Sequence, residues 1–508
     1  MNRNALILPL AVALLTAASS AALAQALPQA NDPYFAVGRA TLAEKLKLAP
    51  NTKRAKNVIL FVGDGMGIST VTATRILDGQ LKGVDGESNR LAMEQLPYAA
   101  LSKTYTHDAQ VADSAPTATA LVAGVKTING VIGVNSETKL HDCASATGKD
   151  VMSLAGIAER AGLSTGVVST ARISHATPAA MYAHTPHRDW ESDANMQAGD
   201  IAAGCKDIAA QLVAWPQGDG LEVALGGGRD RFLPTTMADP EDASRTGSRK
   251  DGRDLTKEWL ARYSNSGSYF WNKAQFDAID GKTTPRLLGL FERSHMKYEA
   301  DRAGDKGGEP SIAEMTTKAI DILSQNQNGF FLMVEGGRID HGHHDGEAQR
   351  ALLDGVAMDA ALKAALAKVD LEETLIIVTA DHSHVFTIGG YPERNNPIFG
   401  TVQIGGKPTK ASDGKGYTTL SYANGPGAVK MNAERPDPLT EDTKALGYKQ
   451  QALVPMESET HAGEDVAIFA IGPWAHLFQG VVEQQFVFHV MAHATGWVEK
   501  AGLRAEAK

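Results

Sequence analysis

The stretch from Phe330 to Glu347, F-F-L-M-V-E-G-G-R-I-D-H-G-H-H-D-G-E, constrains the fold more than any other part of this chain. Its apolar start, Phe330–Val334, is typical of a strand that is buried on both faces of a sheet. Two glycines follow Glu335, and three histidines and three more acids crowd the residues beyond them. Carboxylates and imidazoles together are the ligands that zinc and harder divalent cations prefer. A solvated, charged turn is the alternative, but this combination at the end of a buried strand indicates a metal site.

The N-terminus has the pattern of an export signal. One arginine precedes an apolar segment, Ala5–Leu15, that is too short to span a bilayer, and Ala22–Ala24 fits a small-x-small cleavage site. We therefore expect residues 1–24 to be a cleaved signal peptide and residues 25–508 to be the mature protein. No later segment is long and apolar enough to span a membrane, so the prediction is a periplasmic or secreted protein.

The composition is that of a soluble globular protein, with 43% apolar and 21% charged residues. A length of 508 residues suits one large α/β domain with insertions, or two or three ordinary domains. A formal net charge of -10 argues against specific nucleic-acid binding. The two cysteines, Cys143 and Cys205, favour one disulfide in an oxidising compartment, with two buried free thiols as the alternative. A metal site built on the pair is disfavoured because they lie far apart in the sequence.

Short apolar segments rich in β-branched residues alternate with helix-like stretches, and this predicts a central, largely parallel sheet flanked by helices. The expected strands are Asn57–Val62, Thr165–Thr170, Leu221–Leu225, Phe330–Val334, Thr374–Thr379 and Val466–Ile471. Ser311 and Glu314 form a capping box that starts one helix. Two regions break the pattern. Pro234–Lys306 is predicted to be a loop-rich excursion, and Tyr391–Met456 a small insertion within the main domain.

Polar side chains follow four of the expected strands and precede a fifth. Asp64 follows the strand that ends at Val62, Arg172–Thr177 the strand that ends at Thr170, and Glu335 the strand that ends at Val334. The segment Asp381–His384 follows the strand that ends at Thr379, and His461 lies just before the strand that begins at Val466. Ligands of open parallel sheets bind beyond the carboxyl ends of the strands. Each residue alone is open to a simpler interpretation, such as Asp64 as a helix N-cap or Asp381 as the cap of a strand end. Together they predict one composite site.

The segment V-A-D-S-A-P-T-A-T-A, residues 111–120, is typical of a helix start. Ser114 then lies at the helix N-terminus, where the helix dipole and free N–H groups favour an anion such as phosphate or a serine alkoxide. The alternative is that Asp113 or Ser114 is only an N-cap. No G-x-S-x-G motif is present, so the serine of an α/β-hydrolase triad is unsupported. Arg188 is a candidate bidentate clamp for phosphate, with an ordinary surface arginine as the alternative.

These segments closely resemble the alkaline phosphatases, and most closely the longer, animal-type members. The matching motifs are V-I-L-F-V-G-D-G-M-G, V-A-D-S-A-P-T-A-T-A, H-A-T-P-A-A-M-Y-A-H-T, V-E-G-G-R-I-D-H-G-H-H, T-A-D-H-S-H-V-F and E-S-E-T-H-A-G-E-D-V, and the resemblance extends from about Lys53 to about His493. It implies a three-layer α/β sandwich and a metal-dependent phosphate monoester hydrolase of broad specificity. It also implies that Tyr391–Met456 is a crown domain at the interface of a homodimer.

The resemblance also implies roles for individual residues. Ser114 is the implied nucleophile that becomes phosphoserine, and Arg188 the phosphate clamp. The implied metal ligands fall into three sets: Asp64, Asp381 and His382 for one zinc; Asp340, His344 and His461 for the second zinc; and Asp64, Thr177 and Glu335 for magnesium. Around these sets, His175, His341, His343 and His384 are expected to surround the metal ligands without binding the ions.

Two further features of the family are implied with different support. Cys143 and Cys205 match a disulfide-bonded pair. A calcium site is implied at Glu241, Phe291, Glu292 and Glu309, although Glu309 stands where the family usually has an aspartate.

Other interpretations within the same fold class are a sulfatase, a phosphodiesterase and a non-catalytic binding protein. A sulfatase needs an arginine two residues after the proline, and Ser114-Ala115-Pro116-Thr117-Ala118 lacks it. A diesterase often has threonine as the nucleophile and lacks a clamp such as Arg188. A non-catalytic protein is expected to have lost ligands, whereas every family position is filled.

Overall fold

The computed structural model of the chain describes residues 26–430 and 433–504. The predicted signal peptide, residues 1–24, lies outside these ranges. Two units are distinct, one ending at Ala49 and the other beginning at Pro50. The first contains helix α1, Pro33–Lys45, which starts where the Asp32 carboxylate accepts hydrogen bonds from the backbone N–H groups of Tyr34 and Phe35. No described residue of α1 is buried.

The second unit is built on a ten-stranded sheet with the order β17-β2-β16-β8-β1-β7-β3-β4-β6-β5. Strand β16 runs antiparallel to both of its neighbours, and the other pairs are parallel. The prediction of a largely parallel α/β sheet is therefore confirmed. The strands are β1 Asn57–Gly63, β2 Tyr98–Lys103, β3 Ser164–Arg172, β4 Val223–Gly227, β5 Gly267–Phe270, β6 Arg286–Leu290, β7 Phe330–Gly336, β8 Thr374–Ala380, β16 Val466–Ile471 and β17 Val481–Glu483.

All six strands expected from the sequence are present in this sheet, with Leu221–Leu225 displaced to Val223–Gly227. The prediction of a loop-rich excursion over Pro234–Lys306 was wrong in one respect. The region contains β5 and β6, which extend one edge of the sheet, and helices α10 (Leu255–Arg262) and α11 (Lys273–Asp277). The two strands are short and contain glycine, serine and arginine, so they do not form the apolar runs by which the other strands were recognised.

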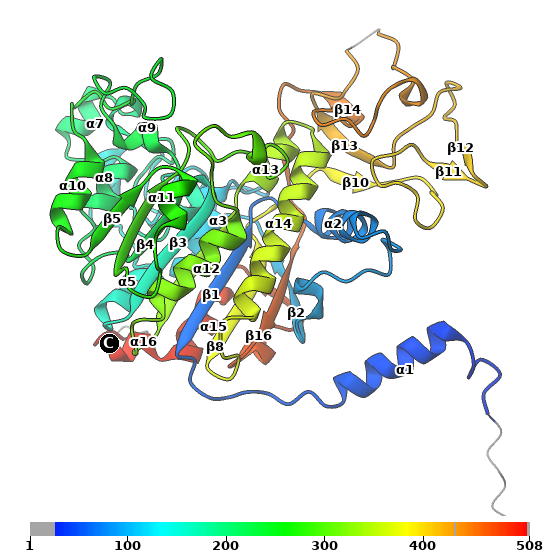
Figure 1. Ribbon diagram of the computed structural model, residues 1–508, viewed down its shortest axis with the longest axis horizontal. Helices are drawn as coiled ribbons and strands as arrows, with labels where there is room; N and C mark the ends of the chain where they lie inside the picture. The colour runs from blue at the N-terminus through cyan, green and yellow to red at the C-terminus, as the bar shows by residue number, and fades with distance from the viewer. Residues whose placement is uncertain (1–25, 431–432, 505–508) are drawn as a thin grey trace, which may run out of the picture. The chain divides into compact units, whose positions relative to one another are not determined.

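Helices cover both faces of the sheet and produce three layers (Figure 1). Alternate residues of β1 point to opposite faces. Val58 and Leu60 belong to one hydrophobic core together with residues of α3 (Ser114–Ala123), α5 (Leu154–Arg160) and α15 (Phe486–Thr495). Ile59 and Phe61 belong to the other core, with residues of α12 (Ile312–Leu323) and α14 (Ala348–Leu366). The capping box of Ser311 and Glu314 does start α12.

A smaller β-rich region lies beside helix α2, Ile68–Leu81. Its three-stranded sheet consists of β10 (Phe386–Ile388), β13 (Leu420–Gly425) and β14 (Ala452–Pro455). A third core joins Ile76 and Leu77 of α2 to Phe386 and Leu420 of this sheet. The assignment of Tyr391–Met456 as a crown domain remains a prediction.

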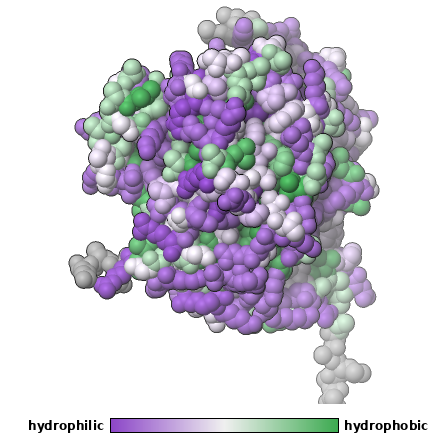
Figure 2. Space-filling view, turned by 60° about the vertical axis from the view of Figure 1, so that its left-hand side comes forward, coloured by the Kyte–Doolittle hydropathy of each residue, from purple (hydrophilic) through white to green (hydrophobic). Residues whose placement is uncertain are grey.

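The other elements are short. They are the helices α4 Cys143–Ala146, α6 Ala176–Ala179, α7 Ala198–Ala202, α8 Ile208–Val213, α9 Arg229–Phe232, α13 Arg338–His344 and α16 Trp497–Lys500; the 3₁₀ turns Met93–Gln95, Asp193–Asn195, Arg302–Gly304, Pro438–Thr440 and Ala475–Leu477; and the two-residue strands β9 Ser383–His384, β11 Gln403–Ile404, β12 Lys407–Pro408 and β15 His461–Ala462. Within the described part of the chain, no helix combines the length and apolarity needed to cross a bilayer. The face drawn in Figure 2 carries mainly hydrophilic residues, with hydrophobic ones in small groups.

Candidate active site at the carboxyl edge of the sheet

The parallel register of three central strands places their polar ends side by side. Gly63, the last residue of β1, pairs with Gly336 of β7 and with Ala380 of β8. Asp64 and Asp381 are the residues that follow β1 and β8, and Glu335 is the penultimate residue of β7. Parallel strands end at the same edge, so the sheet itself gathers these three buried carboxylates.

Ser114 lies over this edge as the first residue of α3. The helix is capped by Asp113, whose carboxylate accepts a hydrogen bond of 2.8 Å from the backbone N–H of Ala115. The capping interpretation therefore applies to Asp113 and leaves the Ser114 hydroxyl available. The Ser114 Oγ lies 3.1 Å from His382 Nε2 and 3.5 Å from Asp64 Oδ1. The serine thus faces the carboxylate and imidazole group at the helix N-terminus, as the sequence predicted.

Asp64, Asp381 and His382 form the group closest to Ser114. His382 Nε2 lies 3.4 Å from Asp64 Oδ1 and 3.3 Å from Asp381 Oδ2. The Oδ2 atoms of both aspartates are buried and have no hydrogen-bond partner. An unpaired carboxylate oxygen in the interior is costly, and a bound cation removes that cost. These three residues fit a metal ion.

The second group combines Asp340 and His344 of α13 with His461. The Nδ1 atoms of His344 and His461 lie 2.6 Å and 2.8 Å from the backbone carbonyls of Glu459 and Ala112. A carbonyl only accepts, so each Nδ1 carries the hydrogen and each Nε2 presents a lone pair. The two Nε2 atoms are 3.0 Å apart, and Asp340 Oδ1 lies within 3.4 Å of both. Two lone pairs and a carboxylate converging on one point fit a cation.

The third group is made of oxygen ligands. Glu335 Oε1, Thr177 Oγ1 and Asp64 Oδ2 are all buried and lack hydrogen-bond partners, while the other oxygen of Glu335 accepts from the Ser169 hydroxyl. An all-oxygen set of this kind suits a hard cation such as magnesium.

The pKa shifts of the carboxylates also favour a bound cation. Burial and then the neighbouring carboxylates raise the pKa of Asp64 well above its ordinary value, and burial raises the pKa of Glu335 to about 7. For Asp340, burial also opposes ionisation, but the imidazoles of His344, His384 and His461 outweigh it and hold the pKa well below its ordinary value. A cluster in which carboxylates disfavour one another's charge is one that positive ions stabilise.

Arg188 reaches the site through Asp113. Its Nη1 donates to Asp113 Oδ1 at 2.9 Å, and its Nη2 lies 3.2 Å from His175 Nε2. Asp113 is the N-cap of the helix that begins with Ser114, so Arg188 bonds to the residue that precedes the serine. The role of Arg188 as a phosphate clamp remains a prediction.

The four histidines that the sequence placed around the ligands all lie in this region. His384 Nε2 lies 2.8 Å from Asp340 Oδ1, and its Nδ1 bonds to the Glu459 carboxylate. Burial lowers the pKa of His384, but these two hydrogen bonds outweigh burial and raise it to about 9. His343 is buried between Thr70 Oγ1 and the Tyr422 hydroxyl, at 3.0 Å and 2.8 Å.

His175 and His341 pack together with a third imidazole, His295, which the sequence interpretation missed. Glu459 was also missed, although it holds His384 and lies two residues before His461 in E-S-E-T-H. The only signal for Glu459 was that proximity. His295 had none, because it lies in a loop after the unrecognised strand β6.

The predicted calcium ligands are close together at a separate place. Arg229 donates to Glu241 Oε2 at 2.9 Å and to the Phe291 carbonyl at 3.1 Å. Buried oxygens of Glu292, Glu309 and Asp305 lack hydrogen-bond partners, and Lys297 forms an ion pair with Glu292. Burial raises the pKa of Glu309 to about 9 and that of Asp305 to about 7. Asp305 is thus an additional acid of this cluster that the sequence analysis did not name.

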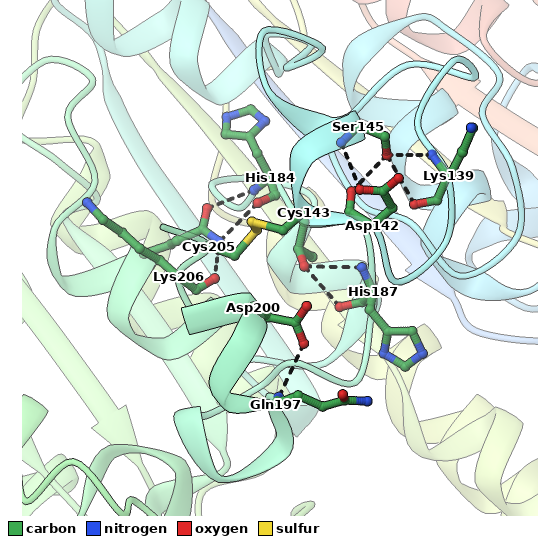
Figure 3. Close-up of a disulfide and its surroundings, with 12 residues drawn as sticks. Lys139, Asp142, Cys143, Ser145, His184, His187, Gln197, Asp200, Cys205 and Lys206 are labelled. Atoms are coloured by element: carbon green, nitrogen blue, oxygen red, sulfur yellow. Dashed lines mark hydrogen bonds between the residues drawn. A yellow bond between two sulfur atoms is a disulfide. The ribbon is translucent and has the colours of Figure 1, made fainter. Parts of the chain in front are cut away.

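Cys143 and Cys205 form a disulfide across a sequence separation of 62 residues (Figure 3). The expectation of one disulfide is confirmed.

An α/β protein that gathers carboxylates, imidazoles and one serine at its sheet edge has the architecture of a metal-dependent hydrolase. The sequence profile of the family described as Alkaline phosphatase matches residues 55–497, and the chain belongs to this family. It is 46% identical over 459 residues to the alkaline phosphatase of Gadus morhua, covering 89% of this chain and 94% of that protein. It is 47% identical over 450 residues to the tissue-nonspecific isozyme of Homo sapiens, covering 87% and 84%. The protein is therefore a phosphate monoester hydrolase of a metal-dependent family.

Solved structures agree with this assignment. The alkaline phosphatase of Thermus thermophilus superposes with a TM-score of 0.63 at 25% identity, covering 88% of this chain and 93% of that one. A mutant of the alkaline phosphatase from the Antarctic bacterium TAB5, with magnesium bound in its M3 site, has a TM-score of 0.60 at 25% identity, covering 88% and 99%.

Proposed function

We propose that the protein hydrolyses phosphate monoesters through a phosphoserine at Ser114, with two zinc ions and one magnesium ion. The observation that carries the proposal is the position of the Ser114 Oγ, 3.1 Å from His382 Nε2 and 3.5 Å from Asp64 Oδ1, at the N-terminus of α3. A hydroxyl held against metal ligands, under a helix dipole, is suited to attack a phosphoryl group.

Each metal has a set of residues that fits it. Asp64, Asp381 and His382 hold the zinc beside Ser114; Asp340, His344 and His461 hold the other zinc; and Asp64, Thr177 and Glu335 hold magnesium. When bound, the two zinc ions lower the pKa of an attacking hydroxyl or water and stabilise the negative charge of the attacking and leaving oxygens.

The residues of the chain transfer the phosphoryl group and hold it during hydrolysis. Ser114 Oγ attacks phosphorus in line, an O–P bond forms at the serine, and the bond to the leaving alcohol breaks. Water then attacks the phosphoserine, releases inorganic phosphate and returns the serine hydroxyl. Arg188 and the free N–H groups of α3 hold the remaining phosphoryl oxygens during both steps.

Broad specificity follows from this arrangement. All of these interactions are made with the phosphoryl group and the oxygens that it exchanges, so the rest of the leaving alcohol contributes little to recognition. We propose small phosphate monoesters as a class of substrate.

Three further predictions belong to this proposal. The cluster of Glu241, Phe291, Glu292 and Glu309, with Asp305 added, is proposed to hold calcium because a buried oxygen of Glu309 and one of Asp305 lack hydrogen-bond partners. The resemblance of Tyr391–Met456 to a crown domain supports a homodimer. The N-terminal pattern supports export to the periplasm or the medium.

One assay separates the monoesterase from its alternatives. Hydrolysis of an aryl phosphate monoester, a diester and a sulfate is measured at alkaline pH before chelation, after chelation and after zinc and magnesium are restored. The expected result is a strong preference for the monoester, loss on chelation and recovery with both metals. Monoester hydrolysis that survives exhaustive chelation would contradict the mechanism, and a preference for the diester or sulfate would favour those enzyme classes.

The nucleophile is tested by trapping the covalent intermediate. Radiolabelled phosphate is incubated with the protein at acid pH, where hydrolysis of the phosphoserine is slow, and protein-bound label is counted. Ser114→Ala is expected to retain no label, while Ser311→Ala, which removes only a helix cap, is expected to retain it. Covalent phosphate in Ser114→Ala would assign the nucleophile to another residue.

A further inference from the structure

Arg188 is the last residue of a short segment, His184–Arg188, that is fixed by backbone contacts. Thr185 and Ile132 exchange two hydrogen bonds of 2.9 Å and 3.0 Å, and the backbone N–H of Arg188 donates to the Gly130 carbonyl at 2.7 Å. These contacts hold one side of the segment, called the inner side, against Ile132 and Gly130. The opposite, outer side of the segment is held by other bonds.

The outer side borders a cavity of about 510 Å³ that is lined in part by His184, Pro186 and the two cysteines. A segment next to a cavity lacks close packing on that side, so specific bonds must position it. Two such sets of bonds are present. One is made by His141, two residues before Cys143, and the other by Gln211, whose side chain also bonds to the residue after Cys205.

The first set comes from Cys143. Two residues before it, the backbone N–H of His141 donates to the Pro186 carbonyl at 3.1 Å, and the His141 ring stacks on His187 with centroids 3.8 Å apart. The side chain of Asp142, between them, caps the short helix α4. The position of His141 is therefore tied to that of Cys143.

The second set comes from Cys205 (Figure 3). The side chain of Gln211 accepts from the backbone N–H of His184 at 2.9 Å and donates to the His184 carbonyl at 3.0 Å. The same amide nitrogen donates to the carbonyl of Lys206, the residue after Cys205, at 3.0 Å. The amide thus joins His184 to the loop that carries Cys205.

We propose that the Cys143–Cys205 disulfide, together with His141 and Gln211, is a positioning device for the phosphate clamp Arg188. The disulfide connects the loop of His141 with the loop that leads into α8, which carries Gln211, so opening it loosens both the His141 contact and the Gln211 contact. A displaced segment carries the Arg188 guanidinium away from Asp113 and the phosphoryl group. The proposal rests on the proposed function of Arg188.

The test measures inhibition of the metal-loaded enzyme by inorganic phosphate in two variants. One is the double substitution Cys143→Ser and Cys205→Ser, and the other is Gln211→Met, which keeps the disulfide and the side-chain length but removes the amide hydrogen bonds. Both are expected to raise the inhibition constant by roughly 10-fold and to raise KM more than they lower kcat, because a misplaced clamp weakens binding of the phosphoryl group. Asp200→Ala, which only removes a cap in the neighbouring helix α7, is the matched control and is expected to change neither constant.

The same variants are then made in an Arg188→Ala background, where they are expected to cause no further rise in the inhibition constant. A general loss of structure would lower phosphate affinity in both backgrounds, and that result overturns the proposal. An unchanged inhibition constant in Gln211→Met and in the serine variant, with Arg188 present, overturns it as well. A wild-type enzyme that phosphate does not inhibit contradicts the proposed function itself, whereas normal wild-type inhibition with unaffected variants contradicts only this inference.

Discussion

At the scale of single residues, hydrogen-bonding direction decides which atoms of the site are available. The backbone carbonyls of Glu459 and Ala112 force the hydrogens of His344 and His461 onto Nδ1. The two Nε2 lone pairs therefore meet at 3.0 Å, which is unfavourable without a cation between them. The carbonyl partners, and not the imidazoles alone, suit this group to a metal ion.

Gly65 shows how little room surrounds these side chains. It adopts a positive φ of 65°, and a Cβ there would lie 2.3 Å from His384 Nε2. We expect Gly65→Ala to displace His384 from Asp340, to lower kcat/KM by about 10-fold or more and to reduce the bound zinc, because partners that orient metal ligands typically contribute that much. Activity and zinc content of the purified variant are the measurements.

Gly83→Ala is the matched control for this prediction. Gly83 has a φ of 69°, but a methyl group at its Cβ position would meet no atom within 4 Å. Alanine there incurs the same backbone cost, roughly 1 to 2 kcal/mol, without a clash. It is expected to lower thermal stability only. Equal losses of activity in the two variants would show that backbone strain, not the displacement of His384, explains the effect.

At the scale of elements, periodicity in the sequence predicted the long, buried strands and the positions of the acids at their ends. Val466–Ile471 was predicted to the residue, and the neighbouring positions of Asp64, Glu335 and Asp381 follow from the parallel register of β1, β7 and β8. The short strand β6, which lies between β4 and the edge strand β5, was missed because the run R-L-L-G-L begins with a charge and contains a glycine.

The parts of the site that were missed come from loops. His295 and Asp305 both follow β6, and neither is adjacent to a motif, so only the folded chain brings them to His341 and Glu309. The ligand sets themselves were inferred through resemblance to a family. Periodicity alone predicted that a site lies at this edge, not which metal each residue holds.

The amino edge of the sheet carries a second pair of buried acids, far from the candidate site in the register of the strands. Thr165 at the start of β3 donates its hydroxyl to Glu159 at 2.6 Å and its backbone N–H to Glu222 at 2.7 Å. Burial, and then the charge of Glu222, raise the pKa of Glu159 to about 9, whereas an unfolded carboxyl ionises near 4.5.

The contribution of Glu159 to folding stability therefore decreases as the pH rises. The protonated form of Glu159 is favoured by the folded state, so its contribution to stability is complete below about pH 4.5 and is lost as the pH rises toward 9. Glu159→Gln keeps an accepting oxygen for Thr165 and does not ionise. We expect its melting temperature relative to wild type to rise between pH 5 and pH 9. Glu499→Gln, at an exposed position, is the control, and its melting temperature relative to wild type is expected to stay constant between pH 5 and pH 9. A constant difference in melting temperature for Glu159→Gln would contradict the prediction.

At the scale of the whole molecule, the three layers place four buried carboxyl groups at one edge of the sheet. Asp64, Glu335, Asp340 and Asp381 are all buried there, and the first, second and fourth of these cannot separate without losing the register of β1, β7 and β8. Folding therefore forces acids together, and either protonation or a bound cation can relieve their repulsion. The stability of the fold and the occupancy of the site are thus coupled.

Removal of the metals should therefore destabilise the protein in a pH-dependent way. Burial raises the pKa of Asp64 and Asp381 above their ordinary values and that of Glu335 to about 7, so without metals the folded state keeps protons that the unfolded state releases. Stability supplied by the protonated carboxyls is present below about pH 4 and is lost as the pH rises through 7. We expect the melting temperature of the chelated protein to fall from pH 5 to pH 8 and to recover when zinc and magnesium are added, with the largest recovery at pH 8. Ser311→Ala serves as a metal-independent control, because it should lower the melting temperature equally in both states. A chelated protein that melts at the metal-loaded temperature at pH 8 would show that cations do not compensate the buried carboxylates.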